Sequence, residues 1–204
     1  MPDFHWERRC WTDGYQFVAG VDEAGRGALA GPIVAAAVVF CNGTRLTRKL
    51  AAIDDSKVLS AHVRETLASM IRASASAWAV GAVSADEIDR LGLSRANRLA
   101  MEIALDRLSL APDFVLLDAI TCEVPEPQSG LIDGDAISTS IAAASILAKT
   151  ERDRMMHSAH NDDARYHFDR HVGYGTPLHL AALRTHGPCA LHRRSFRGVL
   201  TEVD

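Results

Sequence analysis

The chain has 204 residues, of which 48% are hydrophobic and 24% charged, and its formal net charge is −4. This length and composition predict a single globular domain and exclude a disordered or fibrous chain. The N-terminus lacks the apolar stretch of a secretory signal, and the most apolar run, residues 28–40, is too short to span a bilayer. We therefore expect a cytoplasmic protein with no membrane contact. The negative charge argues against a nucleic-acid binder, whose surface is usually basic.

The first half of the chain alternates strand and helix patterns. Residues 17–21 are a short apolar run, and residues 33–40 are a continuous valine-rich run typical of a strand buried on both faces. Ser60 can cap a helix whose apolar residues recur every four positions. Residues 77–83 predict a third strand, and a capping box opens a short helix over residues 84–92.

Helices dominate the second half. Residues 94–108 predict an amphipathic helix, and residues 114–117 predict a fourth strand. A long helix should begin near residues 138–140, with a buried alanine-rich first half. The last helix is expected between a Thr176 cap and Gly187. Together these elements predict one α/β domain with a mixed sheet. The four cysteines are scattered, which predicts free thiols in a reducing compartment.

Acidic residues follow two of the predicted strands. Asp22 and Glu23 end the first strand, Asp118 ends the fourth, and Asp135 precedes the long helix. Carboxylates at the ends of buried strands are costly unless a partner compensates their charge, and Mg²⁺ prefers carboxylate oxygens. The pattern therefore favours a site for one or two divalent cations acting on a phosphate. Each acid alone also fits a structural role as a turn, strand-end or cap residue.

The glycine-rich segment after Glu23 has a competing interpretation. Residues 25–30 formally match the G-x-G-x-x-G/A fingerprint of dinucleotide-binding proteins. That fingerprint requires a helix to follow the loop, so that its N-terminus holds the pyrophosphate. Here Gly31 and Pro32 follow, and then a valine-rich strand. A nucleotide-binding oxidoreductase is therefore the weaker hypothesis.

Four sequence stretches resemble the ribonuclease HII family, also called type 2 ribonuclease H. They occur in the order typical of the family and span nearly the whole chain. The stretches are AGVDEAGRG (19–27), DDSK (54–57), SIAAASILAK (140–149) with Arg152 and Asp153, and HVGYGT (171–176) with HRRSF (192–196).

The resemblance implies a ribonuclease H-like fold, with a mixed five-stranded sheet flanked by helices and a helical C-terminal region from about residue 140. It also implies a monomeric endonuclease that cuts the RNA strand of RNA–DNA hybrids and incises 5′ of single ribonucleotides embedded in duplex DNA. The expected products carry 3′-hydroxyl and 5′-phosphate ends. Two metal ions, Mg²⁺ or Mn²⁺, would be held by four catalytic acids: Asp22, Glu23, Asp118 and Asp135.

The family also implies substrate-binding residues. Gly25, Arg26 and Gly27 match a loop that reads the ribose 2′-hydroxyl, the group that separates RNA from DNA. Tyr174 matches a tyrosine that packs on the sugar beside the scissile phosphate. Further polar residues are candidates for phosphate contacts, with a solvated surface as the alternative for each. They are Ser56, Lys57, Ser145, Lys149, Arg152, Arg193 and Arg194.

Four positions depart from the family pattern. Ala119 replaces the glycine that usually follows the third acid, and Ala28 replaces a proline. Val172 and Asp133 stand where lysine is usual or frequent. None of these changes removes a catalytic group, but we expect weaker phosphate contacts. A hybrid-binding module that has lost its chemistry therefore remains an alternative.

The net charge conceals a division along the chain. Residues 142–200 hold nine Lys and Arg against five Asp and Glu, together with seven of the nine histidines. The other residues hold 13 basic and 21 acidic side chains, among them the four proposed metal ligands. The negative total is thus compatible with a nuclease whose later segment meets phosphates, and it predicts salt-sensitive substrate binding.

Overall fold

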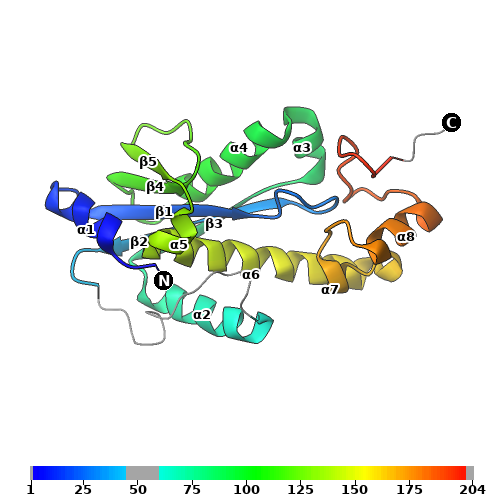
Figure 1. The fold of residues 1–204 in the computed structure, drawn as a ribbon, viewed down its shortest axis with the longest axis horizontal. Helices are drawn as coiled ribbons and strands as arrows, with labels where there is room; N and C mark the ends of the chain where they lie inside the picture. The colour runs from blue at the N-terminus through cyan, green and yellow to red at the C-terminus, as the bar shows by residue number, and fades with distance from the viewer. Residues whose placement is uncertain (1, 45–59, 201–204) are drawn as a thin grey trace.

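The computed structural model describes residues 2–44 and 60–200 of the chain. Its centre is a sheet of five strands in the order β3-β2-β1-β4-β5 (Figure 1). β2 is antiparallel to both β1 and β3, whereas β4 is parallel to both β1 and β5. The predicted mixed five-stranded sheet is therefore confirmed. The strands are β1 (Phe17–Ala24), β2 (Ile33–Cys41), β3 (Ala77–Val83), β4 (Phe114–Asp118) and β5 (Gln128–Leu131).

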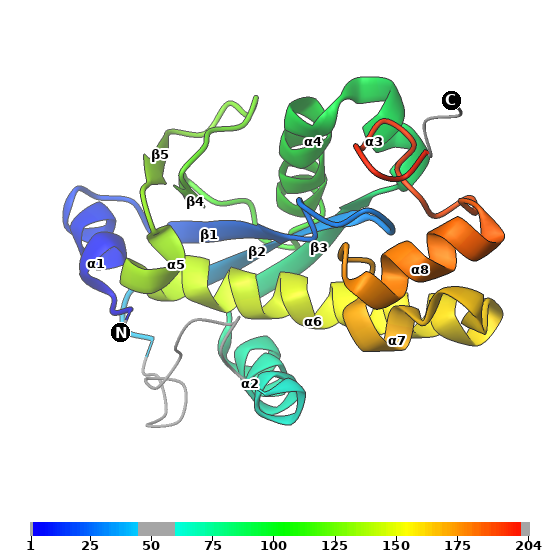
Figure 2. The same ribbon diagram turned by 45° about the vertical axis from the view of Figure 1, so that its right-hand side comes forward.

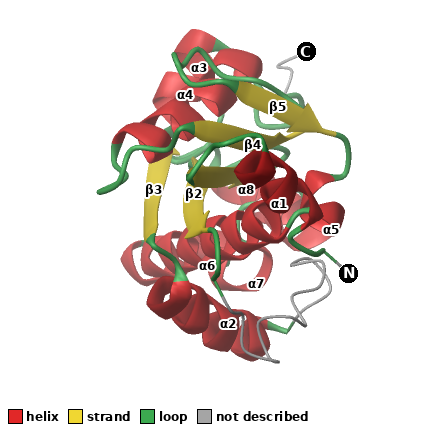
Figure 3. Cartoon of the chain, turned by 90° about the vertical axis from the view of Figure 1, so that its left-hand side faces the viewer, coloured by secondary structure: helices red, strands yellow, loops and turns green. Residues whose placement is uncertain are grey.

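Helices cover both faces of the sheet. α3 and α4 lie on one face, α6 crosses the other with α2 outside it, and α7 and α8 pack at the far end of α6 (Figures 1, 2 and 3). The helices are α1 (His5–Thr12), α2 (Ala61–Ser74), α3 (Ala85–Leu91), α4 (Leu93–Asp106), α5 (Gly134–Ile137), α6 (Thr139–Asp162), α7 (Phe168–His171) and α8 (Pro177–His186), with a 3₁₀ turn at Ala164–Tyr166.

The capping signals predicted the helix limits closely. The Ser84 and Glu87 capping box opens α3, and the Thr176 hydroxyl accepts a hydrogen bond from the backbone of the first turn of α8. The structure also contains elements that the sequence did not predict, namely α1, β5, α5 and α7. These are short, and β5 reads Gln-Ser-Gly-Leu, which has no strand pattern.

The first turn of α6 packs directly against β1. A Cβ atom added to Gly20 would lie 2.1 Å from the carbonyl carbon of Ser140, so only glycine allows this approach. The alanine-rich first half of α6 is buried, as predicted, with Ala143 and Ala144 fully inaccessible. This close packing carries the next turns of α6 beneath the end of β1, where the acidic residues lie.

Among the described residues, no helix is long and apolar enough to cross a membrane. The four cysteines are free thiols, in agreement with their scattered positions.

Candidate active site

Three of the predicted acids meet at one edge of the sheet. β1 and β4 are parallel neighbours, and Val21 pairs with Leu117, so the acids that follow these residues lie side by side. Asp22, Glu23 and Asp118 line a cavity of about 250 Å³. The other residues that line it are Ala24, Gly25, Arg26, Gly27, Ser145, Lys149 and Tyr174. The cavity thus brings together predicted catalytic acids, the predicted ribose-reading loop, the predicted sugar-packing tyrosine and two candidates for phosphate contacts.

Burial and neighbouring negative charge both disfavour ionised acids in this cluster. Asp22 is only 6% exposed, and burial raises its pKa to about 8, assisted by Glu23 and, more weakly, Asp118, while a hydrogen bond with Ser145 acts in the opposite direction. Burial also raises the pKa of Glu23, against the influence of the Asn97 amide and Arg26. The Arg26 guanidinium lies 4.0 Å from the Glu23 carboxylate. The side chains that line this cavity therefore favour a bound cation.

Asp135 stands beside the cavity. It lies on α5, directly after Gly134, whose N–H donates a 2.7 Å hydrogen bond to Oδ1 of Asp118. Asp135 is not among the residues that line the cavity with the other three acids. The hydrogen bond from Gly134 nevertheless ties the start of α5 to the end of β4, which keeps the fourth acid next to the third.

The donor set fits a hard divalent cation in its chemistry. Carboxylate oxygens are the preferred ligands of Mg²⁺, and the three acids that line the cavity are buried or partly buried and carry the same type of charge. In the described part of the chain, however, no three His, Cys, Asp or Glu side chains converge closely enough to ligate one ion as they stand. The acids thus fit a divalent cation by their chemical type and charge, although their present positions do not form a ligand set.

The loop between β1 and β2 follows the acids directly. Gly25 has φ +88°, and a Cβ atom there would lie 1.8 Å from Nε of Arg152, so both conformation and space require glycine. The loop continues into β2 at Ile33 and not into a helix. The helix N-terminus that a dinucleotide fingerprint needs is thus missing, which contradicts the oxidoreductase hypothesis.

Arg152 and Arg193 do not occupy the positions that the sequence suggested. Both side chains are fully buried, and each guanidinium donates three hydrogen bonds of 2.7–3.1 Å to backbone carbonyls. All three nitrogens of each guanidinium thus bond the protein itself, so the predicted phosphate contacts are corrected to a role in holding loops. The six accepting carbonyls belong to Gly25, Arg26, Ala30, Gly31, Pro32 and Val172.

Tyr174 and Arg194 are exposed, and Lys149 is partly exposed. Tyr174 is 37% exposed as a whole residue, and Nζ of Lys149 lies 5.8 Å from the centroid of its ring. Lys149 also forms a 2.6 Å ion pair with Asp153. Arg194 is exposed, with its backbone N–H bound to Asp89. Ser145 lines the cavity. The predictions for Ser56 and Lys57 lie outside the described residues.

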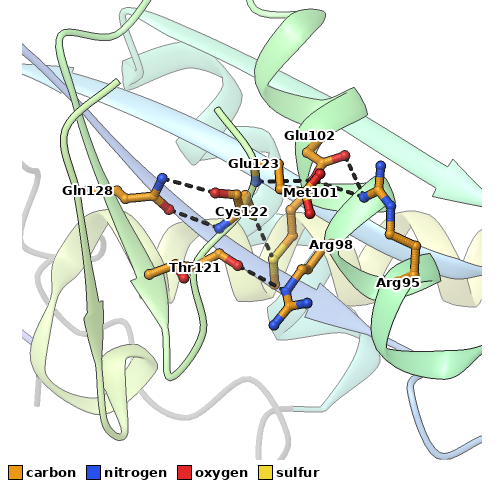
Figure 4. Close-up of polar contacts among 8 residues, drawn as sticks. All are labelled: Arg95, Arg98, Met101, Glu102, Thr121, Cys122, Glu123 and Gln128. Carbon is orange, nitrogen blue, oxygen red and sulfur yellow. Dashed lines mark hydrogen bonds and ion pairs between the residues drawn. The ribbon is translucent and has the colours of Figure 1, made fainter. Parts of the chain in front are cut away.

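A network from α4 holds the loop that follows Asp118 (Figure 4). Nε of Arg98 donates to the carbonyl of Thr121, and the Gln128 side chain bonds both backbone groups of Cys122. Glu102 accepts hydrogen bonds from Arg95 and from the backbone of Glu123. The polar face of α4, predicted from periodicity, is therefore in part an anchor for the segment between β4 and β5.

Two buried polar residues near the acids were missed by sequence reasoning. Glu7 of α1 is fully buried, and its Oε1 accepts hydrogen bonds from the hydroxyls of Ser138 and Ser140 and from the Ser140 N–H at 2.7–2.8 Å. Glu7 thus fixes the junction between α5 and α6 at Ser138, three residues after Asp135. Asn97, 1% exposed, acts on the pKa of Glu23. No local sequence pattern marks either residue, because both partners are distant in the chain.

Comparison with known proteins decides the family. The family model described as Ribonuclease HII matches residues 19–199. The chain belongs to the ribonuclease HII family. It is 50% identical to Ribonuclease HII of Myxococcus xanthus over 95% of this chain and 65% of that relative, and 48% identical to the Burkholderia ambifaria protein over 93% and 86%.

Solved structures agree with this assignment. The chain resembles the ribonuclease HII in a structure of the PCNA:RNase HII complex from Archaeoglobus fulgidus, with a TM-score of 0.74, 27% identity, and 89% of this chain and 95% of that chain covered. The fold is therefore ribonuclease H-like, as the resemblance implied. The chain is a hydrolytic nuclease of the ribonuclease H type, a class that acts on RNA paired with DNA.

Proposed function

We propose that this member of the ribonuclease HII family incises the 5′ side of single ribonucleotides embedded in duplex DNA, besides cutting the RNA strand of RNA–DNA hybrids. The products would carry 3′-hydroxyl and 5′-phosphate ends. One observation carries the proposal: three acids, the Gly25–Gly27 loop and Tyr174 line a single cavity. Groups suited to cutting a phosphodiester and to recognising a ribose are thus within reach of one nucleotide.

The acids would hold two divalent cations, Mg²⁺ or Mn²⁺. Asp22 supplies a buried carboxylate, Glu23 and Asp118 supply partly buried ones, and Asp135 adds a fourth from α5. Cations held there would supply activation of a water molecule and stabilisation of the leaving 3′-oxygen. The Ser145 hydroxyl bonds Asp22 and orients it within the cavity.

The loop and the tyrosine would select the ribonucleotide. A Cβ atom at Gly27 would meet nothing within 4 Å, so the backbone of the loop is open at this lining residue, which would let peptide groups approach a ribose 2′-hydroxyl. The exposed ring of Tyr174 offers a flat apolar face to the sugar. Arg26, Lys149 and the exposed Arg194 remain candidates for phosphate contacts.

The remaining proposals concern the chain as a whole. We take residues 1–204 as one catalytic domain that acts as a monomer, with the helical region from about residue 140 contributing to substrate binding. Its excess of basic residues favours contact with phosphates. The departures at Val172 and Asp133 leave fewer lysines to neutralise phosphates, so affinity should be modest, and the remaining basic contacts should make it fall as salt is raised.

The test compares two isosteric variants on an RNA–DNA hybrid. Asp22→Asn removes a carboxylate from the cavity, whereas Asp106→Asn removes an exposed carboxylate at the end of α4. With Mg²⁺ or Mn²⁺, Asp22→Asn should lose cleavage by at least about a hundredfold while it still binds the hybrid, and Asp106→Asn should retain activity. Full activity in Asp22→Asn would contradict the proposed acid cluster. Tight binding by the wild-type protein without cleavage in any divalent metal would instead favour a non-catalytic binding module.

A further inference from the structure

Three histidines form a buried cluster behind the cavity, where α7 and α8 pack at the end of α6 (Figure 2). His179 is fully buried, and His192 and His171 are 2% and 6% exposed. The rings of His171 and His179 stack with centroids 4.4 Å apart. Nε2 of His179 lies 3.0 Å from Nε2 of His192. The proposed mechanism uses none of these rings.

His179 and His192 form a hydrogen-bonded pair, and the backbone partners at its two ends determine which ring nitrogens carry protons. The N–H of Cys189 can only donate, and it bonds Nδ1 of His192 at 3.0 Å, so this nitrogen carries no hydrogen. The carbonyl of Tyr174 can only accept, and it lies 3.0 Å from Nδ1 of His179, so this nitrogen carries the hydrogen. His192 Nε2–H therefore donates to the bare Nε2 of His179. One chain of hydrogen bonds runs from Cys189 through both rings to Tyr174.

This series of hydrogen bonds from Cys189 to Tyr174 requires both the His179 and the His192 ring to be neutral. A second proton on His179 would face the Nε2–H of His192, and a second proton on His192 would lie on Nδ1 against the N–H of Cys189, so either one would break a bond of the series. Burial lowers the pKa of His171 and His179 and brings that of His192 to about 4, with the neighbouring histidines acting in the same direction. Tyr166, Phe168 and Cys189 contact the rings, and the other titratable groups that act on them without a hydrogen bond are Asp163 on His192 and His167 and Asp169 on His171.

The carbonyl at the end of this chain belongs to a tightly held loop. The Tyr174 N–H donates to the carbonyl of His171, and the Tyr174 carbonyl also accepts from Thr176 N–H. At Gly173, a Cβ atom would lie 2.3 Å from the carbonyl oxygen of Ala30, so the loop is wedged against the segment between β1 and β2. The histidine chain thus anchors the peptide that carries the exposed ring of Tyr174.

We propose that His179 and His192 are positioning residues for Tyr174, which hold its ring at the cavity through the Tyr174 carbonyl. The proposal rests on the proposed function, which places the Tyr174 ring against a ribose. Neither histidine touches the cavity, since neither is among the residues that line it. Their loss should therefore weaken substrate binding more than the chemical step.

The experiment compares His179→Leu, which removes the donor to Tyr174, with His179→Asn, whose amide can still donate from the Nδ1 position. His157→Asn, at an exposed histidine of α6, serves as the control. Using a duplex with one ribonucleotide, we expect His179→Leu to raise KM by about two- to tenfold, the range for one hydrogen bond. kcat should change by less than about twofold, and His179→Asn should recover most of the lost affinity.

A spectroscopic measurement tests the chain without reference to cleavage. In the wild-type protein, ¹⁵N–¹H correlation of the histidine rings at neutral pH should show His179 with its proton on Nδ1 and His192 with its proton on Nε2. Opposite tautomers, or a KM unaffected in folded His179→Leu, would overturn the inference. If the wild-type protein failed to cleave, the proposed function would fall, whereas the tautomers and the substrate Kd of the two variants would still decide the positioning role.

Discussion

Replacing Ala119 with glycine should stabilise the protein. Ala119 follows Asp118 directly and has φ 59°, in the left-handed region. Its methyl group is exposed, and its N–H donates to the carbonyl of Leu131, a bond that glycine would keep. The change therefore removes backbone strain at little cost in packing.

The magnitude follows from two opposing terms. An L-residue in the left-handed conformation costs about 1–2 kcal/mol. Glycine avoids this cost but loses about 0.5–1 kcal/mol more than alanine through backbone entropy on folding. The net gain is about 0.5–1 kcal/mol, which corresponds to a rise in Tm of about 1–4 °C for a domain of this size.

Thermal unfolding with a matched variant checks this reasoning. Ala181→Gly, at an exposed position within α8, introduces the same residue where the backbone is helical. It should lower Tm by a few degrees, since glycine within a helix costs about 1 kcal/mol relative to alanine. Equal shifts of the same sign in both variants would show that the conformation at Ala119 does not govern the effect.

Three further predictions concern buried charged groups. Arg193→Lys should lower the free energy of unfolding by about 2–4 kcal/mol and raise KM, because the lysine ammonium cannot replace the three hydrogen bonds of the guanidinium to the loop. Chemical denaturation measures this loss, and the control Arg197→Lys, at an exposed arginine, should not show it. Glu7→Ala should lower the free energy of unfolding by about 3 kcal/mol, since the donors of Ser138 and Ser140 lose their acceptor. The control Glu65→Ala, on the surface of α2, should be nearly neutral in the same assay. Without divalent metal, the pKa of Asp22 is raised to about 8, so the folded state holds this proton more tightly than the unfolded state does. The free energy of unfolding should therefore fall as pH rises from about 4 to about 8. Asp22→Asn should flatten this part of the plot of Tm against pH, and an unchanged slope would show that Asp22 is not the source of the pH dependence.

The sheet and most helices could be predicted because their determinants are local. The apolar run of β2, the capping box of α3 and the Thr176–Gly187 limits of α8 each carry their own signal over a few residues. The convergence of Asp22 and Asp118 also follows from short-range reasoning, because each ends a buried strand and parallel neighbours end at the same edge. Such features need no knowledge of distant contacts.

Other parts of the site depend on contacts that no local pattern encodes. Arg152 and Arg193 are predicted from the sequence as candidates for phosphate contacts, yet their partners are backbone carbonyls, five of the six about 120 to 170 residues away. Glu7 meets Ser140 across 133 residues. The histidine chain to Tyr174 likewise becomes visible only when α8 and the C-terminal loop are packed together.

The most direct test of the central claim maps the products from a DNA duplex that contains one ribonucleotide. With Mg²⁺ or Mn²⁺, the wild-type protein should make a single cut on the 5′ side of the ribonucleotide and leave a 3′-hydroxyl, while the same duplex without the ribonucleotide stays intact. Equal cutting of both duplexes, or no cutting of either, would contradict a cavity in which acids and a ribose-reading loop act on one nucleotide.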